Sequence, residues 1–111
     1  MPTFDRYDVV SVPFPYTDRA ALERRPALVV SEPMLERNFG LLWVLMITAA
    51  ENRAWQSDVP IPDHHGVGLP IPSIIRPTKI ATVEASRARQ RGRISTATAT
   101  AVAKAIRSII C

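Results

Sequence analysis

Two places in the sequence combine residue types that can act on a phosphate group. Arg24 and Arg25 stand directly before Pro26 and a short apolar run, and Thr48 ends the most apolar run of the chain. A guanidinium at the start of a strand can hold a phosphate through two parallel hydrogen bonds. Both features also suit a structural role, since charged pairs commonly solvate a loop end and a strand-end hydroxyl often bonds its own backbone. The residues alone leave both interpretations open.

The signatures of most other chemistries are missing from the sequence. Its four glycines form no phosphate-binding loop, and it has neither a nucleophile elbow nor a catalytic-cysteine motif. His64 and His65 are adjacent, so an extended segment would point them to opposite sides, which favours a solvated loop pair over a metal site. The single cysteine, Cys111, permits no intrachain disulfide and is typical of the cytoplasm. We therefore predict no metal, no cofactor and a cytoplasmic protein.

The charge of the chain is unevenly distributed. The 14 basic and 10 acidic residues give a net charge of +4, with a pI near 10.0. Six basic residues and a single acidic one fall between Arg76 and Arg93. Such an excess favours an anionic partner. The stretch 87–93, basic at every second position, either follows a nucleic-acid backbone or is a solvated segment before a helix.

Short apolar runs bounded by prolines predict the elements that position these residues. A chain of 111 residues fits a single domain, 1–111. Residues 14–24 read as a long exposed loop, and residues 34–40 as either a helical turn or a loop. The run 41–48 is apolar on both faces and so central, whereas 57–62 has the alternation and prolines of an edge strand. The predicted strands are 8–13, 26–31, 41–48, 57–62, 73–77 and 79–83, the last two separated by a turn.

The last segment changes to a helical period. Ser95 can cap a helix over 96–110, whose apolar residues follow i, i+3, i+4, i+7 spacing. We expect its end, 108–111, to pack against the sheet. The predicted fold is mostly β, a small bent antiparallel sheet or barrel with this helix against it. The longest apolar run, 40–50, is too short to span a membrane, and residues 1–7 lack the apolar region of a secretory signal.

Five segments, in order, resemble the MazF/PemK family of toxin endoribonucleases. They are DVVSVPFPYTD (8–18), RRPALVVS (24–31), IT (47–48), GLPIPSIIR (68–76) and GRIS (92–95). The resemblance implies an SH3-like β-barrel of the MazF/PemK/CcdB type with a C-terminal helix, usually a homodimer. It also implies a type II toxin that cleaves single-stranded RNA without a metal, leaving 2′,3′-cyclic phosphate and 5′-OH ends. A cognate antitoxin would inhibit it by placing an acidic disordered segment in the RNA groove at the dimer interface.

The resemblance assigns the catalytic roles to Arg25 and Thr48. Arg25 would stabilise charge on the phosphate, and Thr48 would orient it. Aromatic side chains can stack on unpaired bases, although for Phe14 and Trp43 core packing is the stronger expectation. The predicted RNA-binding residues are Phe14, Tyr16, Thr17, Arg24, Trp55, Ser73 and Arg76.

The sequence departs from the family pattern in three places. Tyr7 stands where a glycine is common, Ala49 stands where a serine is usual, and the loop 19–23 has no glycine. Two other functions compete with RNA cleavage. One is a noncatalytic CcdB-like toxin that binds DNA gyrase through its C-terminal residues, and the other is a degenerate RNA-binding module.

Overall fold

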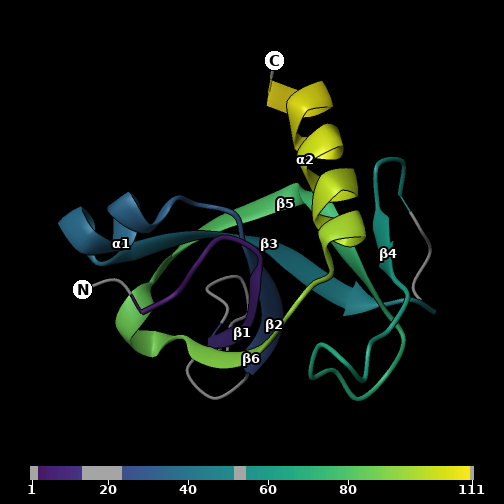
Figure 1. Ribbon diagram of the computed structural model, residues 1–111, viewed down its shortest axis with the longest axis horizontal. Helices are drawn as coiled ribbons and strands as arrows, with labels where there is room; N and C mark the ends of the chain where they lie inside the picture. Colours follow the sequence, from purple (N-terminus) through teal and green to yellow (C-terminus); the bar gives the residue numbers. More distant parts are fainter. Residues whose placement is uncertain (1–2, 14–23, 52–54, 111) are drawn as a thin grey trace.

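A computed structural model of the chain describes residues 3–13, 24–51 and 55–110. Six antiparallel strands form one curled sheet in the order β4-β5-β3-β2-β1-β6 (Figure 1). This confirms the predicted mostly β fold with a C-terminal helix. The elements are β1 (Asp8–Pro13), β2 (Arg24–Val29), α1 (Pro33–Phe39), β3 (Leu41–Ala49), β4 (Val59–Ile61), β5 (Ser73–Glu84), the 3-10 turn η2 (Ala85–Arg87), β6 (Arg89–Arg93) and α2 (Thr96–Ile110).

The central strand β3 is buried on both faces, as its sequence predicts. Leu42 and Val44 belong to one apolar core, and Leu45 and Ile47 to a second core on the opposite face. The second core includes Val102 of α2, so the helix covers this face. Fully burying each such side chain stabilises the fold by about 1.5–3 kcal/mol. The two cores fix β3 and its neighbours from both sides.

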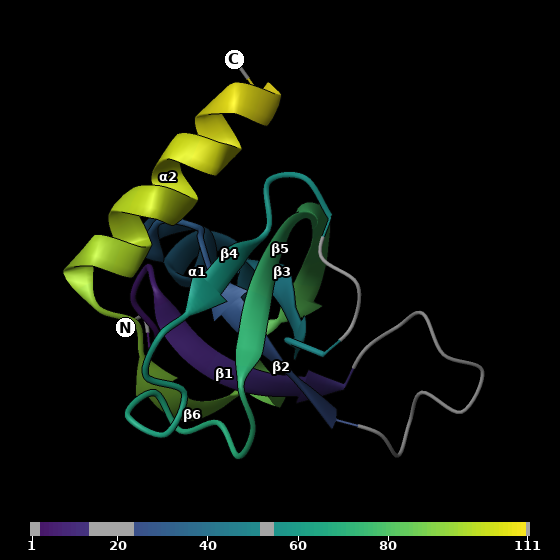
Figure 2. The ribbon, with the colours of Figure 1, turned by 90° about the vertical axis from the view of Figure 1, so that its right-hand side faces the viewer.

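Helix α2 has the bounds that the sequence predicts, but its last turn packs differently. The Ser95 hydroxyl accepts a hydrogen bond from the Thr98 amide at 3.2 Å, which caps the helix. It packs on the second core as far as Ala105 and Ile106, whereas its last turn extends beyond the strands (Figure 2). Ile109 and Ile110 are 48% and 69% exposed. The expectation that the last turn packs against the sheet is therefore wrong.

One long strand replaces the two short ones predicted over 73–83. In β5, Ile80 pairs with Leu45 and Arg76 pairs with the next residue, Met46, so the residues between them form a bulge. A bulge tolerates Pro77, which could not donate to a regular ladder. The sixth strand is instead β6, which pairs with β1. It was missed because its side chains are mostly exposed, so it carries no apolar alternation.

Two backbone positions explain local features of the sequence. Helix α1, which the sequence left open, has Pro33 in its first turn and ends at Gly40 in the left-handed conformation, φ +68°. Tyr7, at the position where the resemblance places glycine, has φ +76°. A side chain is strained in this conformation. The ring of Tyr7 packs against the second core, a contact that glycine would lack.

Candidate active site

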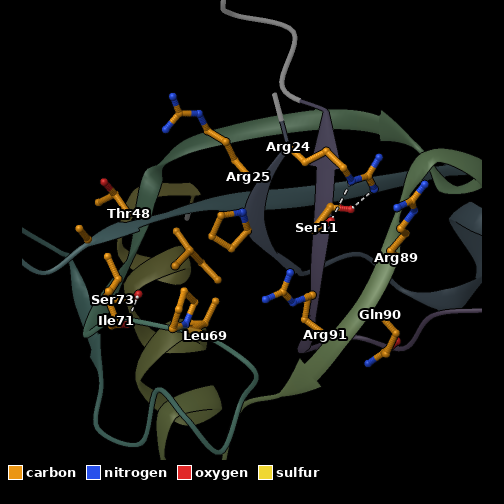
Figure 3. Close-up of a pocket in the computed structure, with 14 residues that line it drawn as sticks. Ser11, Arg24, Arg25, Thr48, Leu69, Ile71, Ser73, Arg89, Gln90 and Arg91 are labelled. Atoms are coloured by element: carbon orange, nitrogen blue, oxygen red, sulfur yellow. Dashed lines mark hydrogen bonds between the residues drawn. The ribbon is translucent and has the colours of Figure 1, made fainter. Parts of the chain in front are cut away.

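A pocket of about 660 Å³ opens where β2 begins and β3 ends (Figure 3). These two strands are antiparallel neighbours, so the start of one meets the end of the other. The residues after Val67 form the opposite wall. The lining residues are Ser11, Arg24, Arg25, Pro26, Ile47, Thr48, Ala49, Leu69, Pro70, Ile71, Ser73, Arg89, Gln90 and Arg91.

The strand register places Arg25 and Thr48 together. Ala27 pairs with Met46, and Arg25 and Thr48 each lie two residues farther toward the pocket. Side chains two residues apart on a strand share a face. Continued by two residues beyond the last hydrogen-bonded pair, the same register sets Arg25 across from Thr48. Both side chains line the pocket, Arg25 exposed and Thr48 half-buried (Figure 3).

Arg24 also lines the pocket, and it ties three elements together. Its Nε donates to the Ser11 hydroxyl at 2.9 Å, and its Nη2 donates to the carbonyls of Ser11 and Arg87, each at 2.6 Å (Figure 3 shows the bonds to Ser11). Burial, and then the positive charge of Arg89, lower the pKa of Arg24 from its ordinary value. An arginine nevertheless stays protonated at neutral pH. Arg24 thus joins β1, β2 and η2 at the edge of the pocket, and its role in binding RNA stays a prediction.

Strand β6 supplies Arg89 and Arg91, which the sequence marked only as part of a basic run. Arg91 Nη2 donates to the carbonyl of Gly68 at 3.0 Å. Next to it, a Cβ on Gly92 would lie 2.5 Å from the Val67 carbonyl oxygen, so this position requires glycine. The close approach places the residues after Val67 against β6 as a wall of the pocket. The alternation of basic residues in 87–93 is the sequence feature that could have indicated that β6 contributes arginines to the pocket.

The other predicted site residues are divided between two places or cannot be placed. Ser73 is buried at the pocket, and its hydroxyl donates to the Ile71 carbonyl at 2.9 Å. Arg76 and Trp55 lie together outside the pocket lining, with the guanidinium carbon 4.1 Å from the ring centroid. The predicted residues that lie outside the described part of the chain are Phe14, Tyr16 and Thr17.

Two further predictions concern the burial of Trp43 and the arrangement of His64 and His65. Trp43 is 50% exposed, so the prediction that it packs in the core is wrong. The rings of His64 and His65 lie 4.1 Å apart, tilted against each other, in a turn. Over residues 3–13, 24–51 and 55–110, no three His, Cys, Asp or Glu side chains gather in a group that could hold a metal ion.

The pocket is strongly cationic. Four arginines line it, and no acidic residue is among the lining residues that the structure describes. Apolar side chains from β3 and from the wall after Val67 form part of the remaining surface, beside polar ones such as Thr48 and Ser73. Arginines provide paired donors for phosphate oxygens, and apolar surface can accommodate unstacked bases. The arrangement is suited to a flexible polyanion such as single-stranded nucleic acid.

Comparisons with known proteins agree on one family. The family model described as "PemK-like, MazF-like toxin of type II toxin-antitoxin system" matches residues 5–110. A chain of the MazE-MazF crystal structure from Deinococcus radiodurans aligns with 20% identity and a TM-score of 0.76, covering 96% of this chain and 94% of that one. An endoribonuclease in complex with its cognate antitoxin, from a mycobacterial species, gives 18% identity and a TM-score of 0.75, covering 96% and 93%.

A third solved structure is similar to the same extent. The Mycobacterium tuberculosis toxin MazF-mt6 aligns with 20% identity and a TM-score of 0.73, covering 91% of this chain and 93% of that one. The comparison with curated protein sequences gives no match. None of the helices in the described part of the chain is long and apolar enough to cross a membrane.

Proposed function

The chain belongs to the PemK-like, MazF-like toxin family of type II toxin–antitoxin systems, and from this premise we propose that it is an endoribonuclease that cleaves single-stranded RNA in the strand-end pocket. One observation carries the proposal. The register of β2 and β3 sets Arg25 against Thr48 within a pocket that four arginines line, with no acidic residue among the described lining residues.

In the proposed reaction, the ribose 2′ oxygen attacks the adjacent phosphorus. The bond from phosphorus to the 5′ oxygen breaks, the 2′-OH loses its proton, and the 5′ oxygen gains one. The products are a 2′,3′-cyclic phosphate and a 5′-OH end. Negative charge grows on the phosphate oxygens, and Arg25 stabilises it through charge-assisted hydrogen bonds. Thr48 holds the phosphate in the orientation for attack.

The partner that controls this activity is proposed to be a cognate antitoxin with an acidic disordered segment. Solved structures of similar fold include a MazE-MazF complex and an endoribonuclease with its cognate antitoxin. An acidic segment is complementary to the arginines of the pocket, so it would compete with RNA for the same charges. Because the substrate is cellular RNA, the proposed location is the cytoplasm.

An exposed apolar surface beside the protruding half of α2 supports a homodimer. Trp43 lies two residues before Leu45 and Ile80 pairs with Leu45, so all three share the face that α2 covers. Trp43 and Ile80 are 50% and 49% exposed. A second copy could cover these exposed side chains and the exposed end of the helix. Sedimentation equilibrium at micromolar concentration should give twice the mass of the chain, and the mass of a single chain would contradict the dimer.

The test of cleavage compares three variants on a long single-stranded RNA in EDTA. Arg25→Ala should lower the cleavage rate about 100- to 1000-fold, the effect of removing one transition-state donor. Thr48→Val should also lower it, since the valine keeps the shape without the hydroxyl. Arg37→Ala removes the same charge from α1, away from the pocket, and should cleave like the wild type. Full activity in Arg25→Ala would remove this residue from the mechanism.

The same assay separates the competing functions. The exposed end of α2 is the observation that favours gyrase binding through the C-terminal residues. Intact RNA with inhibition of DNA gyrase would support that function. RNA binding without cleavage would support a degenerate RNA-binding module. Mapping the cleaved ends for cyclic phosphate tests the proposed reaction directly.

A further inference from the structure

A second cluster of charged and aromatic side chains lies beside the pocket, at the β4 edge of the sheet. Asp58 and Arg76 form an ion pair of 3.0 Å, and their side chains are only 4% and 9% exposed. The Arg76 Nε also donates to both Asp58 oxygens, at 3.2 and 3.3 Å. Asp58 further accepts a hydrogen bond from the Trp55 amide at 2.7 Å. One carboxylate therefore fixes both the guanidinium and the backbone of Trp55.

The ring of Trp55 rests on this fixed guanidinium. The Arg76 carbon lies 4.1 Å from the ring centroid, and the Lys79 ammonium lies 5.4 Å from it. Lys79 belongs to the bulge of β5 that directly follows Arg76. Even so, Trp55 remains 45% exposed. The cluster thus holds a partly open aromatic surface with two cations close to it.

Strand register places this cluster next to Thr48 on the same face of the sheet. Thr48 pairs with Ile74, and Arg76 follows Ile74 by two residues on β5. Diagonal neighbours of this kind have Cβ atoms about 7–8 Å apart. Arg25 shares this face through the same alternation across β2 and β3. The catalytic pair and the Trp55 cluster are consecutive features of one surface.

We propose that Asp58, Arg76 and Trp55 form a preorganised platform on which an unpaired base of the RNA stacks, beside the phosphate held at Arg25 and Thr48. This inference rests on the proposed function and adds a base-binding subsite to it. An indole accepts any base through its π face, and a neighbouring cation adds to such stacking. Arg76 is then a positioning residue that holds Trp55, in contrast to the direct contact with RNA that the sequence predicts for it. Lys79 is exposed and placed to meet the backbone of the stacked nucleotide.

The test uses a mixed-sequence 2′-O-methyl oligonucleotide, whose blocked 2′ oxygens cannot attack. The chain has two tryptophans, so Trp43→Phe leaves Trp55 as the single indole reporter. Binding of the oligonucleotide should quench its fluorescence. Trp55→Ala should weaken binding about 5- to 150-fold, the range for loss of one stacked base. Trp55→Phe should restore part of the affinity, and Phe39→Ala, an exposed aromatic on α1, should bind like the wild type.

Arg76→Lys separates positioning from charge. Lysine keeps the positive charge, but it can neither donate to Asp58 through two nitrogens nor stack flat on the Trp55 ring. A positioning role predicts weaker oligonucleotide binding and a shifted Trp55 emission in the free protein, whereas a charge role predicts neither. Circular dichroism and a melting curve of this variant confirm that it is folded.

The outcomes distinguish this inference from the proposed function. Quenching, together with weaker binding by Trp55→Ala, supports the platform whether or not the wild type cleaves RNA. Cleavage by the wild type with unchanged affinity and no quenching overturns the platform and leaves the proposed function standing. A wild type that neither binds the oligonucleotide nor cleaves RNA overturns both.

Discussion

Two arginines on the same face of the sheet are held in opposite ways. Arg76 is buried against Asp58 and Trp55, whereas Arg25 is exposed at the pocket, where none of the described lining residues is acidic. A buried guanidinium must be paired because its desolvation is costly. An exposed guanidinium can reach an incoming anion without that cost. The difference separates an arginine that supports the site from one that, in the proposed reaction, contacts the phosphate.

The neighbouring strand decides which of the two roles each arginine takes. Continued by one residue, the register of β4 and β5 places Asp58 across from Arg76, so the edge strand supplies the counter-charge. Beside Arg25, β1 supplies Val12 and β3 supplies Thr48, neither of which is charged. The two arginines thus differ in the charge of their cross-strand neighbours.

The largest effect expected from this difference between Arg76 and Arg25 is the loss of stability when Asp58 is replaced. Asp58→Ala leaves the buried charge of Arg76 without its carboxylate and should lower the free energy of unfolding by about 3–5 kcal/mol. Arg25→Ala removes an exposed side chain and should change it by no more than about 0.5 kcal/mol. Urea unfolding followed by circular dichroism measures both values.

A double variant sharpens the same test. Asp58→Leu with Arg76→Met replaces the pair by apolar side chains and should regain most of the stability that Asp58→Ala loses. It should not regain the affinity for the oligonucleotide, because Trp55 then lacks its cationic support. Equal stability of Asp58→Ala and Arg25→Ala would show that the two arginines do not differ in this way.

Much of the fold could be predicted from apolar periodicity because burial determined those elements. Strand 8–13 and the central position of β3 follow from runs of β-branched and apolar residues, and α2 follows from its 3.6-residue period. Strand β6 could not be found in this way. It is an edge strand with exposed basic side chains, so backbone pairing to β1 and the tight contact at Gly92 hold it in place.

The residues of the candidate site also differ in how far the sequence could predict their positions. Arg25 and Thr48, which the sequence links only through the family resemblance, come together through the pairing of adjacent strands. The ion pair between Asp58 and Arg76 depends on the register of β4 against β5, and the bulge after Arg76 reads in sequence as a turn between two strands. No local sequence pattern predicts such an ion pair. Sequence could therefore mark Arg76 as a site residue without showing what holds it.

Arg24 is an intermediate case and predicts an intermediate effect. Its guanidinium is half-buried and donates three hydrogen bonds, to Ser11 and to the Arg87 carbonyl. Arg24→Ala should therefore lower the free energy of unfolding by about 1–3 kcal/mol, between the values for Asp58→Ala and Arg25→Ala. Arg24→Lys keeps the positive charge but loses the several fixed N–H donors of the guanidinium. If it is as stable as the wild type, charge alone is sufficient at this position and the hydrogen bonds contribute little.

The smallest effect concerns Arg89, which lines the pocket from β6 and is exposed. Arg89→Ala should leave stability within about 0.5 kcal/mol of the wild type. If Arg89 meets one phosphate, the slope of log affinity against log salt for single-stranded RNA should become shallower by about 0.7. Arg37→Ala removes an equal charge from α1 and should leave this slope unchanged, because the contribution depends on contact with the RNA and not on net charge. An equal change of slope in both variants would mean that the pocket attracts RNA only through the overall charge of the protein. The contrast between an acting and a building arginine would then rest on Arg25 alone.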